Sequence, residues 1–319
     1  MKVILFGLGS IGMRHAQILK GNFPHDLFAF RTQRRPKGNS LNIRELYNWE
    51  EVERLKPEVA FITNPTYLHV ETALRCASLG MHLFIEKPLG SSLEKLDDLE
   101  SKCKDKNLTC YVAYCLRFHP VINQIKQECR EKEIYHVRIV CSSYLPRWRK
   151  DFDVQESYSA SDEKGGGVIL DLSHEFDYIQ YLFGEIKDIQ GRYDRVSAVT
   201  LDSEDFADVL ITTEAGVRVN LHLNFFSHWN ERAITVDFKD GYLRGDLLAN
   251  QITYGDKDKK ETRDCPIERN EFFLAQTKYF FDNLNNPGLM NNLNEARKLL
   301  EKILVFKDGK RENSFNHSR

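Results

Sequence analysis

Short apolar runs alternate with helical patterns along the first part of the chain. Apolar runs suit strands that are buried on both faces, and such runs occur at residues 3–6, 27–30, 59–62, 83–85 and 110–113, the fourth of them preceded by His82. After the first run, Ile11, His15 and Ile18 recur at helical spacing. Strands that alternate with helices in this way predict a parallel, doubly wound sheet. We therefore expect an α/β Rossmann domain over residues 1–120.

The pattern changes beyond residue 121, where the strands become longer and apolar positions alternate with polar ones. Residues 135–140, 208–213 and 217–222 are such strands, and turns at residues 214–216 and 240–241 predict two hairpins. Two helical patterns close the chain. We therefore expect residues 121–319 to form an α+β domain with an open, mainly antiparallel sheet and helices on one face.

A glycine-rich turn, Gly7-Leu8-Gly9-Ser10-Ile11-Gly12, joins the first predicted strand to the first predicted helix. In such a turn the first glycine bends the chain, the second lets a pyrophosphate approach the backbone, and the third lets the helix pack on the strand. The helix N-terminus offers free N–H groups to phosphates. Glycine turns can also be purely structural, but the flanking strand and helix favour a dinucleotide site formed by Gly7, Gly9, Ser10, Ile11 and Gly12.

The end of the second strand bears on the choice between NAD and NADP. Arg31 lies 19 residues after Gly12, Thr32 and Arg34 follow it, and no carboxylate lies among them. An NAD site places a carboxylate here for the ribose 2′-hydroxyl, whereas an NADP site uses arginine for the 2′-phosphate. A solvated basic loop is the alternative interpretation. We expect NADP(H) to be preferred, with NAD(H) possible.

Parallel sheets bind ligands beyond the carboxyl ends of their strands, and two further strand ends carry polar groups. The strand over residues 59–62 is followed by Thr63, Asn64, Pro65 and, a few residues later, His69, and the strand over residues 82–85 is followed by Glu86, Lys87 and Pro88. We expect the cofactor to contact Thr63, Asn64, Pro65, His69, Glu86 and Lys87. Lys87 could instead be a surface lysine that pairs with Glu86.

A second glycine-rich segment, Gly165-Gly166-Gly167, leads into a helical stretch that contains Asp171 and His174. Residues three apart share a helical face, so we expect both side chains to leave the same side. Histidine exchanges a proton near neutral pH, and a carboxylate can orient it. The alternative is a histidine with a structural role.

Composition excludes several classes of protein. The 45 basic and 47 acidic residues give a net charge of −2, so no overall field favours nucleic acid or an anionic membrane. The seven cysteines contain no CxxC pair, which argues against a disulfide framework and a zinc site. No stretch reaches the ~18 apolar residues of a membrane helix. We expect a cytoplasmic protein that uses no metal.

Three segments, in the same order, resemble the glucose-fructose oxidoreductase / inositol dehydrogenase (Gfo/Idh/MocA) family: the glycine turn, Glu86-Lys87-Pro88, and residues 165–174. The resemblance implies a Rossmann domain joined to an open-sheet domain, and assembly through that sheet as a homodimer or homotetramer. It also implies NAD(P)-dependent hydride transfer at a secondary alcohol or ketone of a sugar, sugar derivative or nucleotide-sugar.

Carried over by motif, the resemblance assigns the catalytic roles to Lys87, Asp171 and His174. Arg117 matches a motif near the domain junction that lies close to cofactor and substrate. The family commonly places its histidine four residues after the aspartate, and the interval here is three. A branch with this interval, which residues 144–148 and 158–160 also resemble, contains enzymes of bacterial surface-sugar pathways.

We therefore expect Lys87 and His174 to converge beside the nicotinamide as the acid/base pair. The substrate would contact Lys87, Arg117, Trp148, Tyr158, Asp171 and His174. The loop over residues 147–150 could close over the site, with Trp148 stacked on a sugar face, or lie packed on the surface. Two alternatives stay open: a redox sensor that binds dinucleotide without turnover, and an enzyme that uses tightly bound NAD for net non-redox glycoside chemistry.

Overall fold

The computed structural model describes residues 1–32, 38–148, 158–286 and 288–314, with the side chains of residues 158 and 310–314 outside the description. The chain divides into two compact units. The first comprises Met1–Tyr114 and Phe273–Leu300, and the second Cys115–Phe272 and Glu301–Arg319. The sequence predicted a division at residue 120. In the structure the first compact unit ends at Tyr114 and also contains residues 273–300, and Phe280 and Leu289 belong to its core.

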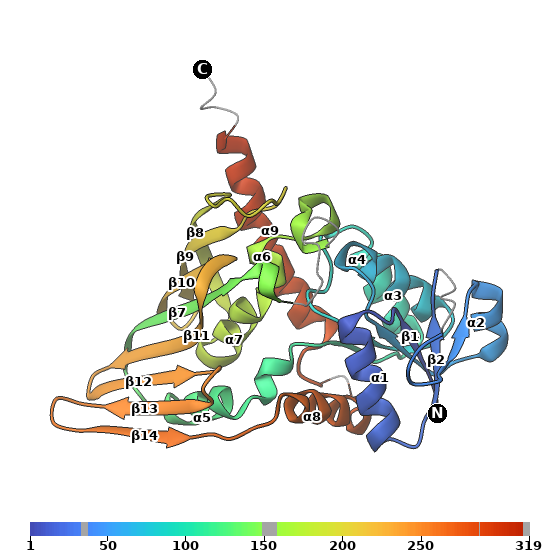
Figure 1. Cartoon of the computed structure of the whole chain (residues 1–319), viewed down its shortest axis with the longest axis horizontal. Helices are drawn as coiled ribbons and strands as arrows, with labels where there is room; N and C mark the ends of the chain where they lie inside the picture. Colours follow the sequence, from blue (N-terminus) through green and yellow to red (C-terminus); the bar gives the residue numbers. More distant parts are fainter. Residues whose placement is uncertain (33–37, 149–157, 287, 315–319) are drawn as a thin grey trace. The chain divides into compact units, whose positions relative to one another are not determined.

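The first unit is built on a six-stranded parallel sheet (Figure 1). Its strands are β1 (Lys2–Phe6), β2 (Asp26–Phe30), β3 (Arg44–Leu46), β4 (Val59–Ile62), β5 (His82–Ile85) and β6 (Cys110–Val112). Their order is β3-β2-β1-β4-β5-β6, which confirms the predicted doubly wound sheet. The order changes direction between β1 and β4, and the carboxyl ends of these two strands are therefore the expected ligand position.

Helices cover both faces of this sheet. They are α1 (Ser10–Asn22), α2 (Trp49–Leu55), α3 (His69–Ser78), preceded by the 3-10 turn η1 (Thr66–Leu68), α4 (Leu96–Asp105), most of α8 (Arg269–Asp282) and the start of α9 (Leu293–Ser314). Phe61 and Phe84 stack with ring centroids 4.3 Å apart, and Phe280 of α8 packs against both. Each such fully buried ring contributes about 1.5–3 kcal/mol.

The second unit contains an eight-stranded sheet in the order β14-β13-β12-β11-β7-β10-β9-β8. The strands are β7 (Ile134–Tyr144), β8 (Ile186–Asp194), β9 (Phe206–Thr213), β10 (Arg218–Asn224), β11 (Phe226–Phe238), β12 (Gly241–Asp246), β13 (Gln251–Gly255) and β14 (Lys260–Asp264). Both predicted hairpins, β9–β10 and β11–β12, are confirmed. The sheet is mainly antiparallel, as predicted, with β7 and β10 as a parallel pair.

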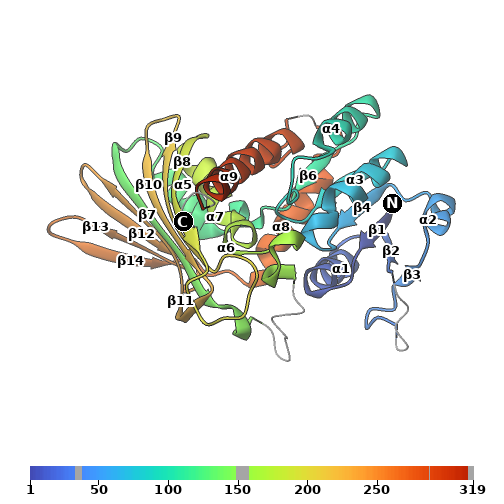
Figure 2. The same cartoon turned by 90° about the horizontal axis from the view of Figure 1, so that it is seen from above.

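Helices lie along one face of this sheet (Figure 2). They are α5 (Pro120–Glu128), α6 (Val168–Asp171), α7 (Ser173–Phe183) and the second part of α9, and the 3-10 segments are η2 (Cys115–Phe118), η3 (Leu145–Arg147), η4 (Tyr158–Ala160) and η5 (Asp162–Lys164). Along β9 and β10, buried residues such as Val209 and Leu221 alternate with exposed ones such as Leu210. One face of the sheet is therefore the core face and the other is open.

The structure corrects the prediction of one regular helix through Asp171 and His174. Helix α6 ends at Asp171, α7 begins at Ser173, and Leu172 between them has φ −97° and ψ 28°. Because the backbone leaves helical geometry at Leu172, the two side chains do not follow the i, i+3 relation of one continuous helix.

In the described part of the chain, no helix combines the length and apolar character needed to cross a membrane.

Candidate active site

The glycine turn has the geometry that a dinucleotide requires. Gly7 has φ +111°, and a Cβ there would lie 2.9 Å from the carbonyl oxygen of Thr63. A Cβ on Gly12 would lie 2.2 Å from the carbonyl oxygen of Gly7, so only glycine lets α1 pack this closely on the turn. A Cβ on Gly9, by contrast, would have no described residue beyond its chain neighbours within 4 Å. Gly9 is therefore the open side of the turn.

The N-terminus of α1 faces this open side without an internal cap. Gly9 is the N-cap residue, no side chain in the described part of the chain caps the helix, and its first turn has no acidic residue. The first N–H groups of a helix have no intrahelical acceptors, and the helix dipole adds positive charge there. Ser10 is exposed and Ile11 is half-buried beside these groups. The segment thus fits the pyrophosphate of a dinucleotide.

Thr63 fixes the glycine turn from the neighbouring strand. Its hydroxyl donates to the carbonyl oxygen of Gly7 over 2.8 Å, and its side chain is buried. The loop continues through Asn64, whose amide donates to the Thr72 hydroxyl over 2.9 Å, and through the exposed Pro65. The carboxyl ends of β1 and β4 are therefore joined by a side-chain hydrogen bond.

Arg31 is held at the end of β2. Its N–H donates to the carbonyl oxygen of Leu46 over 3.0 Å, and its Nη1 lies 3.6 Å from Oε1 of Glu45. Glu45 also accepts hydrogen bonds from Asn39 and Tyr47. Thus the guanidinium at the predicted ribose position already has an acidic neighbour. Thr32 is exposed, and the predicted cofactor residue Arg34 lies outside the described residues.

His69 connects two of the strand-end loops. Its Nδ1 lies 2.8 Å from the carbonyl oxygen of Pro88, and its Nε2 lies 2.9 Å from that of Asn64. The ring is 2% exposed, and burial lowers its pKa. Both ring nitrogens thus have a backbone neighbour, and the predicted contact of His69 with the cofactor stays a prediction. His69 therefore holds the two loops together.

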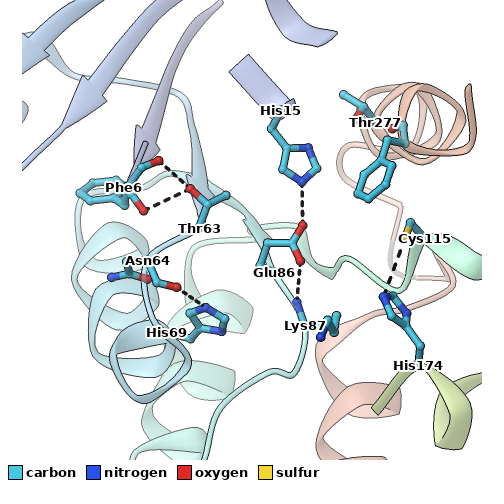
Figure 3. Close-up of polar contacts among 12 residues, drawn as sticks. Phe6, His15, Thr63, Asn64, His69, Glu86, Lys87, Cys115, His174 and Thr277 are labelled. Carbon is cyan, nitrogen blue, oxygen red and sulfur yellow. Dashed lines mark hydrogen bonds and ion pairs between the residues drawn. The ribbon is translucent and has the colours of Figure 1, made fainter. Parts of the chain in front are cut away.

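Glu86 follows β5 and binds a histidine that sequence reasoning did not select. His15 of α1 is fully buried, and its Nε2 lies 2.6 Å from Oε1 of Glu86 (Figure 3). Glu86 also accepts a hydrogen bond from the N–H of Lys87 over 3.2 Å. The only signal for His15 in the sequence was its position on the inward face of α1, which by itself predicts no partner.

Lys87 is half-buried at the carboxyl end of β5, directly after Glu86. Its peptide bond to Pro88 is cis, and Pro88 is buried. The first unit thus brings together the glycine turn, the Thr63 loop and the segment that carries Lys87.

The second unit holds the other predicted catalytic residues. Asp171 is 4% exposed at the end of α6. His174 is half-buried in the first turn of α7, and its Nε2 lies 4.0 Å from Sγ of Cys115. The predicted convergence of Lys87 with His174 joins residues of different units and stays a prediction.

Two ion pairs whose carboxylates are buried fix α7. Arg117 of η2 donates to the Asp177 carboxylate from both Nε and Nη2, with Nη2 2.7 Å from Oδ1. Arg232 of β11, which is half-buried, donates to both carboxylate oxygens of Glu175, at 2.7 and 3.0 Å. Removing one partner of such a pair strongly destabilises the folded protein, because the remaining charge is left buried without a partner. They therefore fix the helix that carries His174.

Arg117 is 5% exposed and bound to Asp177, which is 1% exposed. Its guanidinium also lies 5.0 Å from the ring centroid of Tyr181. The predicted position of Arg117 close to cofactor and substrate stays a prediction. The structure makes Arg117 a residue that positions α7.

The predicted substrate loop is only partly described. Trp148 is 40% exposed, its Nε1 donates to the Ser143 hydroxyl over 3.0 Å, and its ring edge meets Phe225. Arg147 lies over the ring of Tyr144. Arg149, Lys150 and the side chain of Tyr158 lie outside the described residues. Among the described residues, Trp148 therefore packs against Ser143 and Phe225 and is partly exposed.

Among the described residues, no group of three or more His, Cys, Asp or Glu side chains lies close enough to hold a metal ion.

Two matches relate the chain to a protein family. Residues 1–114 match the family described as "Oxidoreductase family, NAD-binding Rossmann fold", and residues 122–244 match the "GFO/IDH/MocA C-terminal domain".

Individual proteins with assigned names are similar to this chain, each over part of its length. The 2,7-anhydro-N-acetylneuraminate hydratase of Escherichia coli (strain K12) is 22% identical over 255 residues, which span 77% of this chain and 68% of that protein. The scyllo-inositol 2-dehydrogenase (NAD(+)) of Bacillus subtilis (strain 168) is 25% identical over 60% of this chain and 56% of its own length.

A solved structure, the UDP-N-acetylglucosamine 3-dehydrogenase of Acidithiobacillus ferrooxidans, matches 97% of both chains with a TM-score of 0.78 and 21% identity. At this identity the likeness shows the fold. The two family matches fall in order on the parallel sheet and the mainly antiparallel sheet. The chain therefore belongs to the Gfo/Idh/MocA family of NAD-binding oxidoreductases.

Proposed function

We propose that this protein transfers a hydride between a nicotinamide dinucleotide and a secondary alcohol or ketone of a sugar, sugar derivative or nucleotide-sugar. The observation that carries the proposal is the composition of the first unit's strand ends: an uncapped helix N-terminus at Gly9 and a half-buried Lys87 follow β1 and β5 of the same sheet. A dinucleotide site and a side chain able to move a proton are thus built on one rigid element.

The first unit would hold the dinucleotide. The N–H groups at the start of α1 would bind its pyrophosphate beside Gly9, and the Thr63 loop would lie along it. When bound, the nicotinamide supplies the hydride acceptor or donor. NADP(H) is our proposed preference because Arg31 lies at the ribose position. The guanidinium lies 3.6 Å from Glu45, so a 2′-phosphate would compete with this carboxylate for its N–H groups.

The proton would be moved by side chains of both units. In the oxidative direction, Lys87 would accept the one hydroxyl proton of the substrate, and His174 would share that proton or, in the reverse direction, donate a proton to the carbonyl oxygen. Asp171 would bind a neighbouring substrate hydroxyl or orient the imidazole. The ion pairs of Asp177 and Glu175 keep α7, and with it His174, in a fixed orientation.

The test is a steady-state assay that follows the absorbance of the reduced nicotinamide with a panel of sugars, polyols and nucleotide-sugars. Turnover with at least one secondary alcohol, lost in Lys87→Ala, is the expected result. Dinucleotide binding without turnover on any of these compounds would favour the redox-sensor alternative.

A second candidate function is favoured by one of the relatives. The E. coli relative is a hydratase of an anhydro-sugar by name, so a reaction without net redox change occurs in a protein similar to this one. In that case the purified protein would retain a nicotinamide that does not exchange with added dinucleotide. Substrate would then be consumed, as measured by mass spectrometry, without net change in the reduced nicotinamide.

Self-association through the open face of the eight-stranded sheet is part of the proposal. Leu210 is 55% exposed on this face, next to strands whose outward residues are otherwise largely polar. We expect a dimer or tetramer by light scattering, and Leu210→Glu should shift it towards monomer. A monomeric wild-type protein would contradict this part.

A further inference from the structure

We infer that His15 is a positioning residue for Lys87 and acts through the carboxylate of Glu86. The inference rests on the proposed function, because it assigns His15 a role at the same site. His15 lies on α1, the helix that begins at the glycine turn, and 71 residues separate it from Glu86. One contact therefore joins the helix of the phosphate site to the segment that carries the proposed base.

The geometry of this contact is that of a short, buried hydrogen bond to a charged acceptor. Nε2 of His15 lies 2.6 Å from Oε1 of Glu86, and the two side chains are 0% and 10% exposed. Bonds to a carboxylate are shorter and about twice as strong as neutral ones. We assign the ring hydrogen to Nε2 because the carboxylate can only accept. Nδ1 has no hydrogen-bond partner among the described residues, so the contact to Glu86 is the polar interaction that orients the ring.

Aromatic rings fix the orientation of the imidazole. Its ring centroid lies 5.0 Å from that of Phe84, 5.7 Å from that of Phe61 and 5.8 Å from that of Phe273. A ring enclosed in this way cannot turn without displacing the core. The Nε2–H is therefore a fixed donor, and the Glu86 carboxylate has a fixed position.

The fixed carboxylate of Glu86 in turn holds the backbone of Lys87. The other carboxylate oxygen of Glu86 accepts from the N–H of Lys87 over 3.2 Å, and the N–H of Glu86 donates to Ile62 of β4 over 2.9 Å. On the far side of Lys87, the carbonyl oxygen of Pro88 meets Nδ1 of His69. The backbone of Lys87 thus lies between two anchored residues. Because the backbone of Lys87 is fixed, its long side chain has fewer conformations. Less conformational entropy is therefore lost when the side chain takes up the position needed for proton transfer.

The test compares variants of His15 by the acetylation rate of Lys87, measured peptide by peptide with mass spectrometry and without any substrate. His15→Phe keeps the ring but removes the donor. We expect Lys87 to be acetylated about three- to tenfold faster. This is the factor by which the loss of one hydrogen bond increases the population of conformations in which the Lys87 segment is open to the reagent. His15→Gln places an N–H donor at a similar distance and should restore most of the wild-type rate.

Two controls separate positioning from general loosening. Lys20 lies on α1 itself and donates to the carbonyl oxygen of Leu41, so its acetylation rate reports whether the helix has moved. His25→Phe changes a histidine of the same unit that packs on Phe23 and Phe281, far in sequence from Glu86. Lys20 should keep its rate in His15→Phe, and Lys87 should keep its rate in His25→Phe.

An unchanged Lys87 rate in His15→Phe, with a lower unfolding midpoint, would make His15 a core residue only and overturn the inference. If His15→Phe does not fold, Glu86→Gln tests the same link, since an amide is a weaker acceptor than a carboxylate. Lys87 should then also react at least about threefold faster, and an unchanged rate would again overturn the inference.

Activity supplies a separate readout. With a turned-over sugar, His15→Phe should lower kcat at least about tenfold while the dinucleotide Kd stays within about twofold, and His15→Gln should recover most of kcat. If no sugar is turned over but the acetylation results hold, the proposed function fails and the positioning of Lys87 by His15 stands.

Discussion

Alanine at Gly9 and at Gly12 should have opposite consequences, although both glycines belong to the same turn. Gly9 has φ −71° and ψ −168°, which any residue adopts, and a Cβ there has no described residue beyond its chain neighbours within 4 Å. Gly9→Ala should therefore fold normally. Its methyl group would stand in the open space beside the N-terminus of α1, where we expect the pyrophosphate.

The size of the binding loss follows from the contacts at stake. Displacing a phosphate from one backbone N–H removes a charge-assisted hydrogen bond worth about 1.5–3 kcal/mol, which corresponds to a roughly 10- to 150-fold weaker Kd. Gly12→Ala instead places a Cβ 2.2 Å from the Gly7 carbonyl oxygen and 2.8 Å from the Thr63 hydroxyl. Overpacking of this kind costs about 1–3 kcal/mol of stability or more.

The assay is a fluorescence titration with NADPH together with urea unfolding, in which Trp49 of the first unit, stacked on Phe6, serves as a probe. Gly21→Ala is the control, because Gly21 lies in α1 and a Cβ there also meets no described atom within 4 Å beyond its chain neighbours and the backbone of its own helix. It should bind as the wild type does and gain about 0.5–1 kcal/mol of stability. Wild-type affinity in Gly9→Ala would refute the assignment of the phosphate to this turn.

Three further predictions concern single side chains. Lys87→Ala should lower kcat at least about 100-fold with the dinucleotide Kd nearly unchanged, and unaltered turnover would remove Lys87 from the chemistry. Replacing Arg31 and Arg34 with alanine should weaken NADPH more than NADH, and equal losses in the two titrations would remove the argument for NADP. Burial, followed by the charge of Arg232, lowers the pKa of His119 from 6.5 to about 4. As the pH falls from 6.5 to about 4, His119 therefore becomes protonated in the unfolded chain before it does in the folded protein. The free energy of unfolding should fall over this range. His119→Asn, which can still accept from the N–H of Val121, should flatten the fall in a series of urea titrations, and an equally steep fall would exclude His119 as its source.

The sequence predicted what local patterns determine. The strands predicted at residues 59–62 and 82–85 became β4 and β5 with these bounds, because strands covered on both faces need mostly apolar residues. The spacing of Gly7 and Gly12 likewise predicted two positions in the turn where only glycine fits.

What the sequence did not reveal depends on contacts between distant residues. Alternation along β7 showed which side chains face inward, but not that β10 is its parallel neighbour. The bond from His15 to Glu86 spans 71 residues and leaves no periodic signal. The stretches on the two sides of Leu172 both have helical patterns. Spacing alone therefore predicted one continuous helix, whereas the structure has two helices separated at Leu172.

The return of residues 273–300 to the first unit has a practical consequence for anyone who wishes to study that unit in isolation. A fragment that stops at Tyr114 would leave the aromatic face of its sheet without Phe280 and Leu289, and we expect it to aggregate. Expressing the missing segment as a second polypeptide, or grafting it behind residue 114 through a flexible linker, should yield a dispersed fragment that still binds dinucleotide.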